Sequence, residues 1–382
     1  MKILVVPDSF KGSLSSLRFC EIAAEVLPRR LPGCSLVTMP MADGGEGTAE
    51  CLVHGTGGEL VACRVTGPMS ETVEARYGLL GDGRIAVVEM AQASGLPLVP
   101  EGRRDPLVAT SRGTGELIVH ALEQGVERII LGLGGSATND AGVGALEALG
   151  FRFLDAGGRE LGPGGAGLAE LAKIETGGAH PRLDACELLI ASDVTNPLLG
   201  ERGATRTYGP QKGADEAALA ILERALEHFA ELSVQALGRD HRETRGAGAA
   251  GGMGFGFLSY LGAGLRSGFE VVAEAYGLER ILRQGEVDLL ITGEGAINFQ
   301  TAQGKLVGRI AALGKRHGVP VIALAGAVEG DVAELYDAGI TSMSSIVDRP
   351  MSLEQAMART ETLLEHKLAD LGSLLVALTG RP

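Results

Sequence analysis

The segment DLLITGEGAINFQTAQGK, residues 288–305, carries the pattern that decides the fold. Its apolar run Leu289–Ile291 predicts a buried strand, which leads into Gly-Glu-Gly, a polar loop and a Gly-Lys pair, and helical spacing follows over VGRIAALGKRHG. A strand that ends in glycine, acid and glycine before a helix typically holds a ligand at the carboxyl edge of a parallel sheet. We therefore expect Gly293, Glu294 and Lys305 to lie at a ligand site.

Strands and helices alternate at both ends of the chain. Such alternation implies right-handed crossovers and a parallel sheet. The predicted strands are residues 3–6, 35–40, 289–292, 319–324 and 342–347. We predict an α/β fold in which residues 1–58 and 285–382 form one discontinuous, flavodoxin-like domain with a doubly wound sheet of five parallel strands.

The middle of the chain has a different texture. From residue 59 to residue 90, β-rich runs broken by turns favour antiparallel pairing, and mixed helices and strands follow. Residues 59–284 are therefore predicted to form an inserted mixed α/β domain. A cleft between the two domains is the expected active site.

Composition excludes several classes of protein. The net charge of −14 and the 4% share of aromatic residues argue against a nucleic-acid partner, which needs a basic face and stacking platforms. No run approaches the length of a membrane span, and the amino-terminal apolar run is too short for a signal peptide. Five cysteines without a CxxC pair fit a reducing compartment, so we expect a cytoplasmic protein.

Acidic and basic residues gather at one predicted edge of the flavodoxin-like sheet. If the strand order is 2-1-3-4-5, Asp8 and Lys11 follow the first strand and lie beside Glu294, with Lys305 nearby. Asp43 follows the second strand on the same edge. Carboxylates suit Mg²⁺ and lysines suit phosphate, so this edge predicts a site for a magnesium-phosphate ligand.

Residues 129–145, IILGLGGSATNDAGVGA, form a second strong element. A strand leads into GLGGSA, and we expect a helix with Asn139 and Asp140 in its first turn. The pattern partly matches the dinucleotide fingerprint, with Asp155 as the distal acid, so a nicotinamide-dependent oxidoreductase is one interpretation. The same backbone amides would serve a nucleoside triphosphate equally well.

Residues 189–213 contain another strand that ends in an acid. Asp193 is a candidate general base or metal ligand, and Asn196 and Lys212 are candidates for orienting an anionic substrate. The alternative is an Asp cap followed by a proline turn.

Nine segments, in one order, closely resemble the type I bacterial glycerate kinases. They are PDSFKGSLS (7–15), PMADGGEGT (40–48), EMAQASGL (89–96), GTGELI (113–118), LGGSATNDAGVGALEALG (133–150), SDVTNPLLGERGAT (192–205), GPQKGA (209–214), GAGAAGGMG (246–254) and LRSGFEVV (265–272). The resemblance implies a two-domain enzyme that uses ATP and Mg²⁺ to phosphorylate D-glycerate. It implies 2-phosphoglycerate as the product, with 3-phosphoglycerate as the alternative, and we expect a monomer or homodimer.

The resemblance also implies site residues, and chemistry suggests their roles. Asp193, Asp8 and Lys11 are the catalytic candidates, and Asp8, Asp193 and Glu294 are the candidate metal ligands. Candidates for binding substrate or phosphate are Ser9, Gly12, Asp43, Gly44, Gly45, Glu46, Gly134, Gly135, Ser136, Asn139, Asp140, Asn196, Lys212, Gly293, Glu294, Gln300 and Lys305.

Two residues of the opening segment depart from the family pattern TGEGRIDxQTxxGK. Ala296 stands in place of Arg, and Asn298 stands in place of Asp. Both changes remove a charge from the expected active edge. A catalytically weakened glycerate- or nucleotide-binding protein of the same fold is therefore the alternative function.

Overall fold

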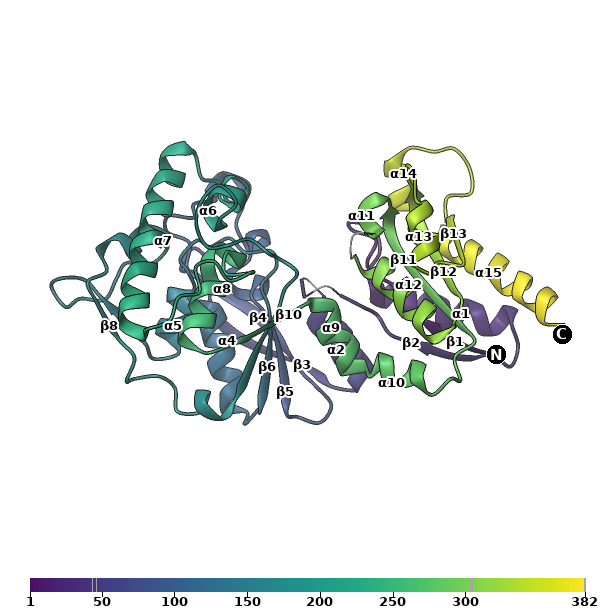
Figure 1. The fold of residues 1–382 in the computed structure, drawn as a ribbon, viewed down its shortest axis with the longest axis horizontal. Coiled ribbons are helices and arrows are strands. Elements are labelled where there is room, and N and C mark those ends of the chain that lie inside the picture. Colours follow the sequence, from purple (N-terminus) through teal and green to yellow (C-terminus); the bar gives the residue numbers. More distant parts are fainter. Residues whose placement is uncertain (43, 46, 303–304, 381–382) are drawn as a thin grey trace. The chain divides into compact units, whose positions relative to one another are not determined.

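The structure, a computed structural model, describes residues 1–42, 44–45, 47–302 and 305–380 (Figure 1). The chain divides into two compact units: unit 1 combines Met1–Ala42 with Val272–Pro382, and unit 2 is Asp43–Val271. Both chain ends therefore belong to unit 1. The predicted domain boundaries, at residues 58 and 285, differ from this division by helices α2 (Thr48–Thr56) and α10 (Leu278–Arg283).

Unit 1 is built on a sheet of five parallel strands in the order β13-β12-β11-β1-β2. The strands are β1 (Lys2–Val5), β2 (Ser35–Thr38), β11 (Leu289–Ile297), β12 (Val321–Val328) and β13 (Ser342–Ser345). Ile3 of β1 lies beside Leu36 of β2 on one side and Leu289 of β11 on the other. In chain order this is the arrangement 2-1-3-4-5, so the predicted flavodoxin-like sheet is confirmed.

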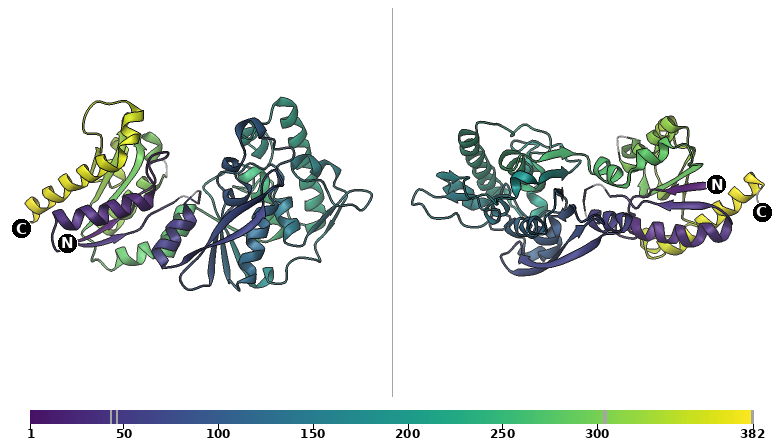
Figure 2. Two further views of the ribbon diagram at one scale, coloured as in Figure 1. Left: turned by 180° about the vertical axis from the view of Figure 1, so that it is seen from behind. Right: turned by 90° about the horizontal axis from the view of Figure 1, so that it is seen from below.

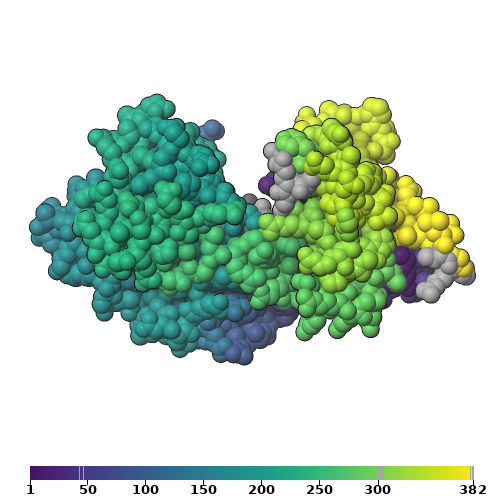
Figure 3. Space-filling view, viewed as in Figure 1, coloured from purple at the N-terminus to yellow at the C-terminus, as the bar shows by residue number. Residues whose placement is uncertain are grey.

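Helices cover both faces of this sheet (Figure 2). On one face, α1 (Ser16–Arg30) and α15 (Thr360–Thr379) bury Phe19 and Leu364 in a cluster with Ile3. The other face carries α12 (Leu306–His317) and α13 (Ala333–Ala338). The short helices of unit 1 include α10, α11 (Phe299–Ala302) and α14 (Leu353–Ala358). α14 lies at the surface, where Leu353 is 76% exposed (Figure 3).

The predicted end of β11 at Thr292 is wrong, because the strand continues to Ile297. Glu294 and Ala296 pair with Ala325 and Ala327 of β12. Glycine is required at position 293, since a Cβ there would lie 2.4 Å from the carbonyl oxygen of Leu324. The Gly-Glu-Gly sequence thus permits a close strand pair, and Glu294 is held on a regular strand instead of in a loop.

Unit 2 contains a mixed sheet of six strands in the order β10-β9-β6-β5-β4-β3. The strands are β3 (Glu59–Thr66), β4 (Thr72–Leu79), β5 (Ile85–Glu89), β6 (Arg128–Gly132), β9 (Glu187–Ala191) and β10 (Gly264–Arg266). β3, β4 and β5 pair antiparallel, whereas β5, β6, β9 and β10 pair parallel. The antiparallel pairing predicted for residues 59–90 is confirmed. A separate antiparallel pair consists of β7 (Arg152–Leu154) and β8 (Lys173–Glu175).

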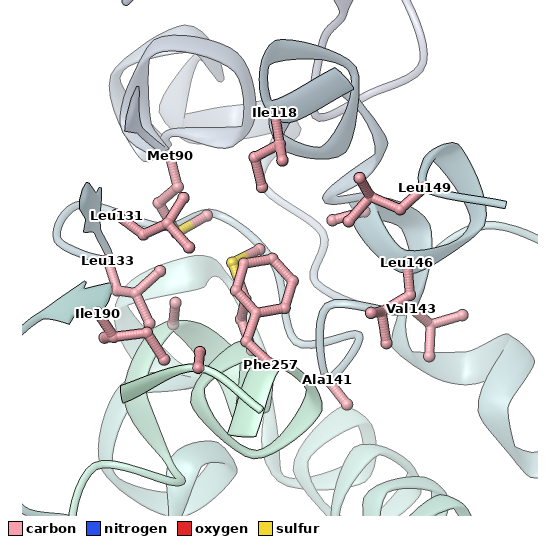
Figure 4. Close-up of a cluster of buried hydrophobic side chains, with 14 of the residues drawn as sticks. Met90, Ile118, Leu131, Leu133, Ala141, Val143, Leu146, Leu149, Ile190 and Phe257 are labelled. Atoms are coloured by element: carbon pink, nitrogen blue, oxygen red, sulfur yellow. The ribbon is translucent and has the colours of Figure 1, made fainter. Parts of the chain in front are cut away.

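The core of unit 2 lies between this sheet and its helices. Figure 4 shows Leu131 of β6 and three helical side chains, Ile118, Leu146 and Phe257, which are all buried. The helices of unit 2 include α2, α3 (Ala91–Ser94), α4 (Arg112–Glu123), α5 (Val143–Ala148), α6 (Ala204–Tyr208), α7 (Glu216–Leu237) and α8 (Ala249–Tyr260). The division between the units falls within α9 (Gly268–Tyr276). Within the described part of the chain, every helix is too short or too polar to cross a membrane.

Candidate active site

The carboxyl edge of the unit 1 sheet begins at the turn after β1. The backbone N–H of Asp8 donates to the carbonyl of Gly293 (2.8 Å), which ties this turn to β11. The carboxylate of Asp8 accepts the N–H of Ser9 (2.7 Å). Lys11 is exposed in the tight turn that follows, where Gly12 has a φ of 78° that favours glycine.

Glu294 is the buried acid at this edge. Its Oε1 accepts the hydroxyl of Thr301 (2.7 Å), and its Oε2 lies 3.7 Å from Nζ of Lys305, the residue before α12. Burial raises the pKa of Glu294, while Thr301, Lys305 and Lys11 act in the opposite direction. Only 7% of Glu294 is exposed, so its charge depends on these partners. The structure thus brings Lys11, Glu294 and Lys305 to one edge, as their positions in the sequence suggested.

The two departures from the family pattern also lie at this edge. Ala296 is a strand residue of β11, paired with Ala327. Asn298 directly precedes α11, and its backbone N–H donates to the hydroxyl of Thr301 (3.2 Å) while its carbonyl accepts the N–H of Thr301 (2.9 Å). An aspartate would make the same backbone contacts, and asparagine suits the residue before a helix as well as aspartate does. The side chain of Gln300 lies outside what the structure describes.

A glycine loop lies on the carboxyl edge of the unit 2 sheet. A Cβ on Gly44 would lie 2.3 Å from the carbonyl oxygen of Ala191 at the end of β9, and one on Gly132 would lie 2.5 Å from the carbonyl oxygen of Gly44. Gly45 meets Gly134 in the same way, with 3.0 Å between its Cα and a Cβ on Gly134. Gly44 and Gly45 therefore pack backbone against backbone with Gly132 and Gly134. Asp43 and Glu46 lie outside the described residues.

The segment after β6 does not form the predicted strand–glycine–helix unit. Gly135 has a φ of 72° and accepts the N–H of Leu96 (2.7 Å), and Ser136 forms a bridge with Gly95. The next helix, α5, begins only at Val143, so Asn139 and Asp140 precede it and are not in its first turn. The glycines therefore stand away from a helix amino terminus, which removes the geometric basis of the dinucleotide interpretation.

Asp140 organises this segment from inside. Its carboxylate accepts the N–H and hydroxyl of Ser111 (both 2.8 Å) and the N–H groups of Gly142 (3.1 Å) and Gly144 (3.4 Å). Burial raises the pKa of Asp140, and these hydrogen bonds act against that effect. The Ser111 hydroxyl in turn accepts the N–H of Ala145 (3.0 Å). Asp140 thus fixes the start of both α4 and α5.

Lys212 and Asn139 are buried in the same region. Nζ of Lys212 donates to the carbonyl of Thr138 (2.6 Å), and burial lowers the pKa of Lys212 to about 7 although Asp140 acts to raise it. Asn139 donates its amide to the hydroxyl of Thr205 (3.1 Å). Among the described residues, Oδ1 of Asn139 and Oγ1 of Thr138 have no hydrogen-bond partner. Buried polar atoms of this kind are expected to have partners. This segment therefore offers acceptors as well as a buried amine.

Asp193 and Asn196 lie on the segment after β9. Asp193 is exposed. The side chain of Asn196 donates to the carbonyl of Arg202 (2.7 Å) and accepts the hydroxyl of Tyr208 (2.8 Å), which folds the segment on itself. Asp193 therefore reaches solvent at the carboxyl edge of unit 2, while Asn196 shapes the backbone beside it.

Sequence reasoning missed Glu89, the last residue of β5. It is 4% exposed and accepts backbone N–H groups at the start of α2. The sequence contained a signal for Glu89, because IAVVE (85–89) is an apolar run that ends in an acid. The apolar run before Asp193 shows a similar pattern. In the described part of the chain, no three His, Cys, Asp or Glu side chains group so as to hold a metal ion.

Glu147, on α5 near Asp140, provides a test of this electrostatic account. Burial raises the pKa of Glu147 to about 7, although Arg112 acts in the opposite direction. Between the model-compound pKa of 4.5 and 7 the folded state therefore binds more protons than the unfolded state, so this group reduces stability as pH rises. Relative to wild type, Glu147→Gln should gain about 1 to 3 kcal/mol in unfolding free energy between pH 5 and pH 8. Denaturant titrations of both proteins at pH 5 and pH 8 measure this gain. A difference in unfolding free energy between variant and wild type that is the same at both pH values would contradict the raised pKa of Glu147.

Comparison with known proteins places the chain in a family. The model of the glycerate kinase family matches residues 3–376. The chain belongs to the glycerate kinase family. Its relatives include the glycerate kinase of Bacillus subtilis (strain 168), which is 47% identical over 373 residues, 98% of this chain and 97% of that protein. The glycerate 2-kinase of Escherichia coli (strain K12) is 46% identical over 356 residues, 93% of each chain.

A solved structure agrees with this assignment. A crystal structure from Salmonella typhimurium LT2, described as a glycerate kinase 2, matches with a TM-score of 0.90 and 43% identity, covering 100% of this chain and 99% of that one. The family resemblance, the α/β fold and the kinase class predicted from the sequence are therefore confirmed. Nothing in the comparisons supports the alternative of a weakened binding protein, and membership in a kinase family displaces the nicotinamide-dependent interpretation.

Proposed function

We propose that this chain transfers the γ-phosphate of ATP to D-glycerate, giving 2-phosphoglycerate and ADP. The observation that carries the proposal is the match along nearly the whole chain to kinases named for glycerate, one of which is a glycerate 2-kinase. The E. coli name favours the 2-phosphate over the 3-phosphate as product. The two lysines at the carboxyl edge of unit 1 supply positive charge of the kind that a transferring phosphoryl group needs.

The proposed roles of the chain's own residues follow from their surroundings. Lys11 is exposed and acts to lower the pKa of the nearby Glu294 carboxyl, so its ammonium lies at this edge and can reach a phosphate. Both oxygens of Glu294 have protein partners, which favours a role in holding Lys305 over direct coordination of a metal. Asp193 is exposed at an edge where a substrate hydroxyl could donate to it, and we assign it the role of orienting that hydroxyl.

Mg²⁺ fits the acids that remain. Asp8 and Asp193 offer carboxylate oxygens, the ligands that Mg²⁺ prefers, and Mg²⁺ usually binds through one or two carboxylates together with substrate phosphates. Asp8 of unit 1 and Asp193 of unit 2 are each, taken separately, a proposed ligand of the ion. When bound, Mg²⁺ would neutralise charge on the phosphates.

Release of ADP tests the function and the two departures together. With Mg-ATP and D-glycerate, we expect wild type and the double variant Ala296→Arg/Asn298→Asp to turn over within about threefold of each other. The reason is that Ala296 is held by strand pairing and that Asn298 bonds to Thr301 through its own backbone, a contact that aspartate would keep. Turnover by the double variant alone would show that wild type is a disabled kinase.

A further inference from the structure

The amino terminus of helix α2 is capped by an acidic side chain from strand β5. The residue before this helix, Gly47, has no side chain and a φ of 86°, so it cannot supply the usual capping oxygen. Glu89, at the end of β5, takes that place: its Oε1 accepts the N–H of Ala49 (2.7 Å), and its Oε2 accepts that of Gly47 at a longer 3.4 Å. The carboxylate also opposes the positive end of the helix dipole.

Glu89 anchors one end of the glycine loop, and the sheet holds the other. Gly44 is pressed against the ends of β6 and β9, where the carbonyl oxygen of Ala191 leaves no room for a Cβ. At the start of α2, Glu89 binds the N–H groups of Gly47 and Ala49. Because these amides already have an internal anion, they are not a free cradle for a substrate phosphate. The glycine loop is instead a fixed segment at the edge where candidate site residues gather.

We propose that Glu89 is a positioning residue of the kinase: by binding the N–H groups of Gly47 and Ala49 it fixes the start of α2, and with it the neighbouring Gly44 and Gly45, in the arrangement that turnover requires. This inference rests on the proposed function. Glu89 does not need to touch substrate. A reaction that depends on alignment is slowed when a loop at the site is displaced by only about 1 Å. The loss should appear in kcat and should persist at saturating substrate, since alignment and not occupancy is disturbed.

Glu89→Gln is the test, with Glu116→Gln as the matched control. Glu116 lies in the same unit, and its carboxylate accepts the N–H (2.7 Å) and hydroxyl (3.0 Å) of Thr66 at the end of β3, the outermost strand. Both substitutions remove one negative charge and replace one accepting carboxylate oxygen by an amide group. With Mg-ATP and D-glycerate, we expect Glu89→Gln to lower kcat at least about tenfold and Glu116→Gln to change it less than about twofold, at similar losses in Tm.

Hydrogen exchange separates this inference from the proposed function. Amides of residues 44–50 should exchange faster in Glu89→Gln than in wild type, while those around Thr66 should not. If wild type turns over no D-glycerate, the proposed function fails and exchange still tests the anchor. Unchanged exchange in residues 44–50, or a kcat loss in Glu89→Gln no larger than in Glu116→Gln, would overturn the positioning role.

Discussion

Replacing Lys11 by alanine should lower kcat/KM for phosphoryl transfer about 10²- to 10³-fold. Lys11 is the exposed cation in the turn after β1, next to the buried Glu294 and on the same edge as Lys305. The variant removes one of the two nearby lysines that would stabilise the negative charge developing on the transferring phosphoryl group. Because the side chain is exposed, the unfolding free energy should change by no more than about 0.5 kcal/mol. Steady-state ADP release and denaturant titration measure the two quantities.

Lys315→Ala is the matched control for that experiment. Lys315 is also exposed and belongs to unit 1, but it lies in the last turn of α12, whereas Lys305 immediately precedes that helix. Its ammonium donates to the carbonyl of Asp337 (2.6 Å). We expect this variant to keep wild-type kcat/KM. Equal activity of the Lys11 and Lys315 variants would remove Lys11 from the phosphate site.

Asp140→Ala should destabilise unit 2 by about 3 to 5 kcal/mol. The substitution leaves the buried N–H groups of Ser111, Gly142 and Gly144 without their acceptor, together with the Ser111 hydroxyl. One buried carboxylate thus accepts four hydrogen bonds, and a buried donor without an acceptor costs free energy of folding. The unfolding free energy from denaturant titration is the measurement.

Two further variants show whether burial is the reason. Asp82→Ala removes an exposed acid with a similar local contact, to the N–H of Arg84 (2.9 Å), and should cost no more than about 1 kcal/mol. Asp140→Asn keeps one acceptor oxygen, so its cost should fall between those of the two alanine variants. If Asp140→Ala cost as little as Asp82→Ala, the four hydrogen bonds would not hold the segment together.

The fold was largely predictable because its pattern is local. Short apolar runs alternating with helical spacing at both chain ends defined five strands, and their parallel pairing followed from general rules of crossover. The strand order 2-1-3-4-5 was an assumption, which the structure bears out. The end of β11 was not predictable, since glycine normally weakens a strand. Here Gly293 is tolerated because β12 approaches so closely that only glycine fits. The position where β11 ends is therefore determined by its pairing with β12, and the sequence of residues 288–305 alone does not reveal it.

The positions of several candidate site residues were predictable from the sequence, but their surroundings and roles were less so. Lys11 and Asp193 follow β1 and β9 and stand at sheet edges as expected, whereas Glu294 lies within β11. Asp140 and Lys212 carry charges that suggest solvent or ligand, yet both are buried and bind backbone groups of their own unit. Burial depends on which segments pack over a residue, so charge and spacing alone could not reveal it. The cytoplasmic location and the state of monomer or homodimer stay predictions.

Phosphorus NMR of the complete reaction is the most direct test of the account. Wild-type protein would be incubated with Mg-ATP and D-glycerate, and the product compared with authentic 2- and 3-phosphoglycerate. The account predicts ADP and one new phosphomonoester signal, that of 2-phosphoglycerate, in equal amounts. A 3-phosphoglycerate signal would correct the position of transfer. No phosphoglycerate of either kind, with ATP left intact, would contradict the proposal that this chain is a glycerate kinase in function as well as in family.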